Sequence, residues 1–153
     1  MTHHRLAALR SGALFAAALA IHLSASADTA TPVRLRPIAE LKAAAVVHVG
    51  ETADWVAITE DAVWVGSTGP FAVHRIDPRT NERVATVALP GEPCAGLATG
   101  FGSVWVPLCT QPPSLAKVDA RRNSLTAVFK VGPAASEGGV AVSADSVWLV
   151  TDA

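Results

Sequence analysis

Apolar and polar residues alternate along several short segments, with the period of two that is typical of half-buried β-strands. The clearest case is 125–131 (LTAVFKV), where the odd-numbered residues are apolar and share one face. Short apolar runs flank Gly100-Phe101-Gly102, which predicts a hairpin turn. Only 38–45 suggests a helical period. The pattern predicts an almost entirely β protein after residue 27.

One short pattern occurs three times and ends each time in Val-Trp. The three copies are 55–64, 96–105 and 139–148, so their tryptophans are 41 and 43 residues apart. A second block, 74–81 (HRIDPRTN), recurs 42 residues later as 116–123 (AKVDARRN). Two blocks that share a period near 42 predict β-propeller blades of four antiparallel strands. We expect the repeated tryptophans to pack between neighbouring sheets rather than to contact a cofactor.

The repeat also predicts boundaries. We expect a linker at 28–43 and a partial β-propeller at 44–153, with blades at about 44–82 and 83–124 and an incomplete blade at 125–153. A fourth strand is expected at 125–131, at 83–89 and, at the start, at 45–49. The ring is expected to be incomplete: the chain is either a fragment of a longer one, or several chains complete a ring together. Self-association through open blade edges is a further expectation.

The Val-Trp-Val strands, the 75–81 turn (RIDPRTN) and the 137–141 strand start (EGGVA) resemble YVTN-type β-propeller repeats. Within that superfamily they resemble the streptogramin lyase (virginiamycin B lyase) branch, over roughly Val46 to Asp152. The resemblance implies a ring of about seven blades. In these lyases a His and a Glu, aided by magnesium, open a cyclic depsipeptide ester by elimination, on later blades than this chain possesses. The resemblance therefore implies no catalytic residue here, and magnesium only if the lyase interpretation holds.

Residues 1–27 have the features of a secretory signal peptide. A basic start is followed by a ten-residue apolar stretch, 12–21 (GALFAAALAI), and by Ala25-Ser26-Ala27 before Asp28. The apolar stretch is about half as long as a bilayer helix requires, and no other segment is long and apolar enough. We expect a periplasmic or secreted protein with no membrane span after signal cleavage.

The charge of the chain limits which kinds of partner it can bind. The chain has 12 basic and 13 acidic residues, and removal of Arg5 and Arg10 with the leader leaves ten basic against thirteen acidic. A weakly acidic body without basic runs argues against nucleic acid and against an anionic lipid surface.

Cys94 and Cys109 are the only cysteines, and the midpoint between them falls inside the predicted turn at 100–102. Antiparallel strands joined by that turn would place the two sulfurs near cross-strand register, at a spacing that a disulfide can bridge. A redox pair and half a metal site are the alternatives, and fourteen intervening residues with no nearby His argue against both. The sequence therefore predicts a structural disulfide and no metal site.

No catalytic motif is present, and we expect neither catalytic residues nor a cofactor in this chain. His48 and His74 both fall in predicted strands, where we expect edge or half-buried residues rather than general bases.

Candidate ligand-binding residues lie in the loops that enter each predicted inner strand, since such loops converge near a propeller's axis. Each loop carries a carboxylate: Asp54 (with Glu51 nearby), Glu92 and Glu137. Trp55 stands where the other copies have glycine, and either contacts a ligand or packs in an atypical first blade. The carboxylates either attract a cation or basic ligand, supply a general acid or base, or are ordinary solvated charges.

Three functions stay open. The first is an exported scaffold that binds a small molecule or protein at the top face of the propeller, without chemistry in these residues. The second is part of a streptogramin-lyase-like enzyme. The third is a structural module that contacts other envelope proteins through exposed strand edges.

Overall fold

The computed structural model describes residues 35–151, so the expected signal peptide at 1–27 lies outside the described residues, as does 28–34 of the expected linker. The chain divides into two units between Leu41 and Lys42. In the described part of the first unit, Ile38–Glu40 forms a single turn of 3₁₀-helix, η1. Between residues 35 and 151 no helix is both long enough and apolar enough to span a bilayer.

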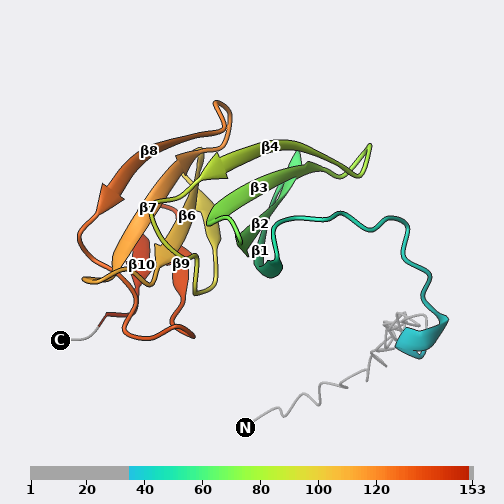
Figure 1. Ribbon diagram of the computed structural model, residues 1–153, viewed down its shortest axis with the longest axis horizontal. Coiled ribbons are helices and arrows are strands. Elements are labelled where there is room, and N and C mark those ends of the chain that lie inside the picture. Colours follow the sequence, from blue (N-terminus) through green and yellow to red (C-terminus); the bar gives the residue numbers. More distant parts are fainter. Residues whose placement is uncertain (1–34, 152–153) are drawn as a thin grey trace, which may run out of the picture. The chain divides into compact units, whose positions relative to one another are not determined.

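The second unit is all-β, and its strands are antiparallel throughout (Figure 1). The first sheet has the order β1-β2-β3-β4, the second β5-β6-β7-β8, and β9 and β10 form a hairpin. The strands are β1 (Thr52–Thr59), β2 (Ala62–Thr68), β3 (Ala72–Asp77), β4 (Glu82–Ala88), β5 (Ala98–Gly100), β6 (Ser103–Leu108), β7 (Ser114–Asp119), β8 (Ser124–Phe129), β9 (Val140–Val142) and β10 (Val147–Leu149). The expectation of four-stranded antiparallel sheets is confirmed.

The sheet boundaries differ from the expected blades at 44–82, 83–124 and 125–153. The two complete sheets run from 52 to 88 and from 98 to 129, and the hairpin from 140 to 149. A tight turn explains the difference: the N–H of Asn81 donates to the carbonyl of Asp77 at 2.8 Å, and Asn81 has a φ of 58°. This turn folds β4 back onto β3, so β4 closes the first sheet instead of opening the second.

The expected strand at 45–49 does not form, and His48 therefore lies outside any strand and is exposed. A fourth strand pairs with the third strand of its own sheet, and the described residues before 45 supply no such partner. A short apolar, valine-rich segment does not make a strand when its backbone N–H and C=O groups have no ladder to join.

The sequence repeat is also a repeat of strand register. Each of the three repeated tryptophans lies opposite an alanine of the preceding strand, in the pairs Trp64–Ala57, Trp105–Ala98 and Trp148–Ala141. In the two complete sheets the same tryptophan lies opposite a basic residue of the next strand, Arg75 or Lys117. The tryptophans thus occupy matching positions in successive sheets.

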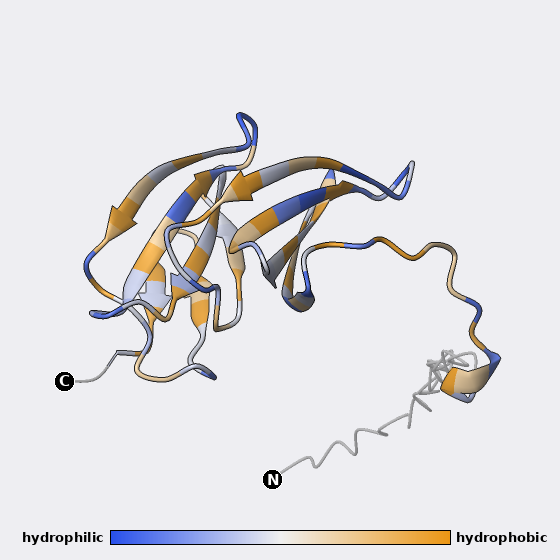
Figure 2. Ribbon diagram, viewed as in Figure 1, coloured by the Kyte–Doolittle hydropathy of each residue, from blue (hydrophilic) through white to orange (hydrophobic). Residues whose placement is uncertain are grey.

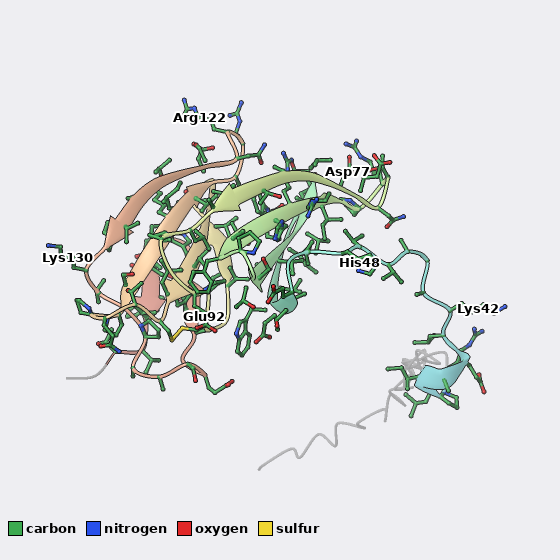
Figure 3. All side chains as sticks on the ribbon, viewed as in Figure 1. Lys42, His48, Asp77, Glu92, Arg122 and Lys130 are labelled. Atoms are coloured by element: carbon green, nitrogen blue, oxygen red, sulfur yellow. A yellow bond between two sulfur atoms is a disulfide. The ribbon has the colours of Figure 1, made fainter. Side chains whose placement is uncertain are left out.

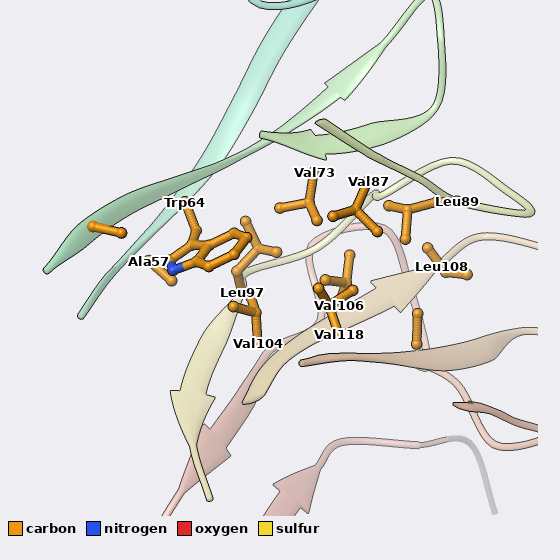
Figure 4. Packing of buried hydrophobic residues seen from close by; sticks show 12 residues of the cluster. Ala57, Trp64, Val73, Val87, Leu89, Leu97, Val104, Val106, Leu108 and Val118 are labelled. Atoms are coloured by element: carbon orange, nitrogen blue, oxygen red, sulfur yellow. The ribbon is translucent and has the colours of Figure 1, made fainter. Parts of the chain in front are cut away.

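The buried tryptophans fill the spaces between sheets. Trp64 packs with Leu97 and Val104 of the next repeat in the largest apolar cluster (Figure 4). Trp105 packs in a second cluster with Val140 of the hairpin. Trp148 is 62% exposed, because within residues 35–151 no further sheet covers it. The expected core packing is confirmed for the first two tryptophans and is wrong for the third.

Successive sheets contact one another through their first strands. β1 contacts β5, β5 contacts β9, and Gly96 and Gly139 form a parallel bridge just before β5 and β9. The approach is close, since a Cβ on Gly100 would collide with Val142. These contacts between first strands put the loops before β1, β5 and β9 near one another.

The turn between β7 and β8 is hydrophilic (Figure 2).

Candidate functional site

The loop that carries Glu92 is held by a disulfide to the residue that follows β6. Cys94 and Cys109 are bonded, with their Cα atoms 5.7 Å apart, which confirms the predicted pairing. Two backbone hydrogen bonds flank it: the N–H of Cys109 donates to the carbonyl of Glu92, and the N–H of Cys94 to that of Pro107. The disulfide lies beside Glu92 (Figure 3). Since β5 has only three residues, this cross-link takes the place of a longer ladder.

All four candidate ligand-binding residues line one pocket of about 150 Å³. Asp54 and Trp55 come from β1, Glu92 from the loop before β5, and Glu137 from the loop before β9. The structure therefore brings the four candidates together as expected, although Asp54, predicted to lie in a loop, belongs to β1. We call this site the acidic pocket and define it by Asp54, Trp55, Glu92 and Glu137.

Trp55 adopts an unusual backbone conformation at the wall of the acidic pocket. Its φ is 51°, in the left-handed region, and the register of β1 against β2 shifts between Asp54 and Val56 in a β-bulge. The N–H of Trp55 donates to Oδ1 of Asp54 at 2.9 Å. A positive φ is an outlier for so large a residue, and such strain clusters at functional sites.

The indole of Trp55 both packs and lines the pocket. It lies against the largest apolar cluster, and a Cβ added to Gly96 would be 3.8 Å from the ring. Gly96, which stands at this position in the next repeat, therefore lies beside the ring at ordinary van der Waals distance. The two interpretations of Trp55, packing and ligand contact, are therefore compatible.

The carboxylates of the acidic pocket lack cationic partners. Asp54, Glu92 and Glu137 are exposed, and none of them belongs to an ion pair within residues 35–151. In that part of the chain no three His, Cys, Asp or Glu side chains are placed to hold a metal ion. Three uncompensated carboxylates beside an indole suit an organic cation, which gains both charge pairing and cation–π attraction.

A buried polar network beneath the pocket was not predicted from the sequence. His74, expected at an edge or half-buried, is only 2% exposed. Its Nε2 is 2.7 Å from the hydroxyl of Ser67, and its Nδ1 is 3.0 Å from that of Thr86. Burial, with a smaller contribution from the charge of Arg83, lowers the pKa of His74 below its ordinary 6.5. The imidazole is therefore neutral at pH 7, with both nitrogens bonded.

This network supports the pocket instead of attacking a ligand. Ser67 lines the acidic pocket but is 1% exposed, and its hydroxyl also donates to the carbonyl of Pro70. A nucleophile needs an open approach, which Ser67 lacks. The one available signal was the repeat itself, because His74 stands where the next copy has Ala116.

No model of a known protein family matches this chain, and a search of curated proteins finds no match either. The resemblance to YVTN-type repeats and to the streptogramin lyases therefore stays a prediction from the sequence.

Proposed function

We propose that this chain is an exported β-propeller segment that binds a cationic group in the acidic pocket and carries out no chemistry itself. The group is the ammonium or guanidinium of a small molecule or of a partner protein. The observation that carries the proposal is the convergence of Asp54 from β1, and of Glu92 and Glu137 from the loops before β5 and β9, around Trp55. The disulfide supports export, because such bonds persist in oxidising compartments.

The size of the pocket limits what enters it. At about 150 Å³ it is smaller than the 300–1,000 Å³ typical of sites for drug-sized ligands. One alkylammonium or guanidinium head group suits this space. The remainder of the ligand would lie outside, as it does when a basic side chain of a partner is inserted.

Binding of agmatine, which carries a guanidinium and an ammonium, tests the proposal. We expect a Kd on the order of 1 mM, measured by NMR shifts that include the indole N–H of Trp55. Glu92→Gln and Glu137→Gln should each weaken binding about three- to tenfold, and Trp55→Phe by about threefold. Glu82→Gln removes one exposed carboxylate outside the pocket and serves as the matched control.

Two results contradict the proposal. One is equal binding of the uncharged analogue butanol, which would show that charge plays no part. The other is an equal loss of affinity in Glu82→Gln, which would show only a general effect of net charge.

The lyase interpretation calls for a His and a Glu in the loops that face the propeller axis, and the lining of the acidic pocket contains no His. The envelope-module interpretation rests on open strand edges. Neither has an observation of its own in residues 35–151 that favours it over cation binding, so both stay predictions.

A further inference from the structure

A larger pocket, of about 600 Å³, lies at the opposite end of the strands from the acidic pocket. Its walls are the β5–β6 turn, β7 and the β7–β8 turn. Figure 3 shows Arg122, in the β7–β8 turn, at one end of the sheets and Glu92 at the other. The volume falls within the range of small-molecule sites. We call it the basic pocket and define it by Phe101, Gly102, Lys117, Asp119, Arg121 and Arg122.

The single acid in the basic pocket is already engaged. Oδ1 of Asp119 accepts the backbone N–H groups of Arg121 and Arg122, and Oδ2 lies 3.1 Å from Nη1 of Arg122. These contacts, led by the backbone N–H of Arg122, lower the pKa of Asp119. Lys117 and Arg121 have no ion-pair partner within residues 35–151. Their two positive charges therefore line the pocket unpaired, since its one carboxylate, that of Asp119, is bonded to Arg122 and to backbone N–H groups.

Comparison with the first sheet shows that the basic pocket lacks one carboxylate. In that sheet Arg75 lies over the ring of Trp64, 5.8 Å from its centroid, and pairs with Asp61 at 2.6 Å. In the second sheet Lys117 lies over the ring of Trp105 in the same way, at 5.3 Å. The residue that corresponds to Asp61 is Gly102, because each is the second residue of the turn before the Trp-bearing strand.

This difference extends to the whole site. Among the eight positions that line the basic pocket, the second sheet has three basic residues and one acidic residue. The equivalent positions of the first sheet have two basic residues, Arg75 and Arg79, and three acidic residues, Glu60, Asp61 and Asp77. The scaffold is shared, so the excess of positive charge is a property of this pocket and does not come with the fold.

The β5–β6 turn supplies an apolar wall. Phe101 and Gly102 have φ values of 53° and 67°, as the two central residues of a type I′ turn require. Asn-Gly is the preferred pair in such turns, yet the first position holds a phenylalanine that is 52% exposed. An aromatic ring kept at this strained position beside two cations suits a ligand with both an anionic and an apolar part.

We propose that the basic pocket binds a small organic phosphate or sulfate ester. The oxyanion contacts Lys117 and Arg121, and the organic part packs against Phe101. A guanidinium matches a tetrahedral oxyanion with paired N–H donors, and a lysine adds a point charge. This site is separate from the acidic pocket and does not depend on the cation proposed there.

Phenyl phosphate and phenyl sulfate are the probes, with inorganic phosphate as the ligand that lacks the ring. We expect NMR shifts at 101–102, 117 and 121–122 on addition of either ester, and binding several-fold tighter than that of inorganic phosphate. Lys117→Gln should weaken ester binding about tenfold, and Phe101→Asn should remove the advantage of the ring while keeping a favourable turn. The ester that binds more tightly shows whether the pocket prefers a phosphate or a sulfate group.

The repeat offers matched controls. Gly102→Asp restores the carboxylate that the first sheet has, and should reduce ester binding about tenfold, whereas Gly102→Asn has the same backbone cost without the charge and should not. Arg79→Gln removes the arginine that corresponds to Arg121 in the first sheet and should leave binding unchanged. The absence of ester binding at about 50 mM, or equal effects of Gly102→Asp and Gly102→Asn, would overturn the proposal.

Discussion

The first sheet, β1–β4, and the second, β5–β8, share strand order, register and a buried tryptophan under a basic side chain, yet they use different means to complete their interiors. In the first sheet Ser67, His74 and Thr86 form a hydrogen-bonded network. The second sheet has Leu108, Ala116 and the exposed Val128 at these positions, all apolar, and adds a disulfide where the first sheet extends its β1–β2 ladder past a β-bulge. The shared features define the scaffold, and the differing ones show that equivalent positions can be completed by polar or by apolar chemistry.

The largest expected effect tests the shared feature. Trp64→Ala and Trp105→Ala should each lower the free energy of unfolding by about 3–5 kcal/mol, because each removes a ring from the space between two sheets. Trp148→Ala should cost no more than about 0.5 kcal/mol, since its ring is exposed. Urea unfolding measures all three. A large loss for Trp148→Ala would mean that something covers that ring in solution.

The disulfide is the next test and concerns the second sheet alone. Cys94→Ser and Cys109→Ser should each lower the free energy of unfolding by about 3 kcal/mol in an oxidising buffer, the loss expected for a closed loop of this length. The two variants should be equally stable, and a reducing agent should bring the wild-type protein to their level. Two reactive thiols in the exported wild-type protein would contradict the pairing.

The buried network tests the first sheet. Ser67→Ala should lower the free energy of unfolding by about 1–3 kcal/mol, because Nε2 of His74 then has no partner. The double variant Ser67→Ala with His74→Leu makes this interior apolar, as in the second sheet, and should recover much of that loss. If the double variant is less stable than Ser67→Ala, His74 stabilises the sheet even without its hydrogen bond to Ser67, and this explanation of the loss is wrong.

The smallest expected effect is a dependence on pH. The pKa of His74 is lowered in the folded protein, mainly by burial, so below its ordinary value of 6.5 the unfolded chain binds more protons. Stability should therefore fall as the pH drops through 6.5 towards the folded pKa, and should not change from this source above it. Unfolding measured between about pH 7.5 and 5.5 tests this, since most carboxylates stay ionised in that window. His74→Leu should flatten the profile, whereas His48→Asn, which changes an exposed histidine, should leave it unchanged.

Much of the scaffold could be predicted because its signals are local or periodic. The turn at 100–102 sets the register of β5 against β6, and that register brings Cys94 near Cys109. The period near 42 likewise indicated which loops share one end, so Asp54, Glu92 and Glu137 were expected together. In both cases a position along the chain translates directly into a position in space.

Other features escaped prediction because they depend on which segments meet. The mostly apolar residues at 45–49 have no strand to pair with among residues 35–151 and stay outside any sheet. His74 is buried because β2 and β4 place Ser67 and Thr86 on either side of its ring. The charged residues of the basic pocket all lie within 117–122, and only folding brings Phe101 and Gly102 of the β5–β6 turn beside them.

For this protein the order of residues alone determined the all-β character, the repeat and the cysteine pair, since strand alternation and turn chemistry act over a few residues. Tertiary structure alone decided which tryptophans are covered, where β4 belongs and how a buried histidine is satisfied. Burial and hydrogen-bond satisfaction depend on neighbours that packing brings from elsewhere in the chain. One tryptophan motif can therefore lie in a core at Trp64 and in solvent at Trp148.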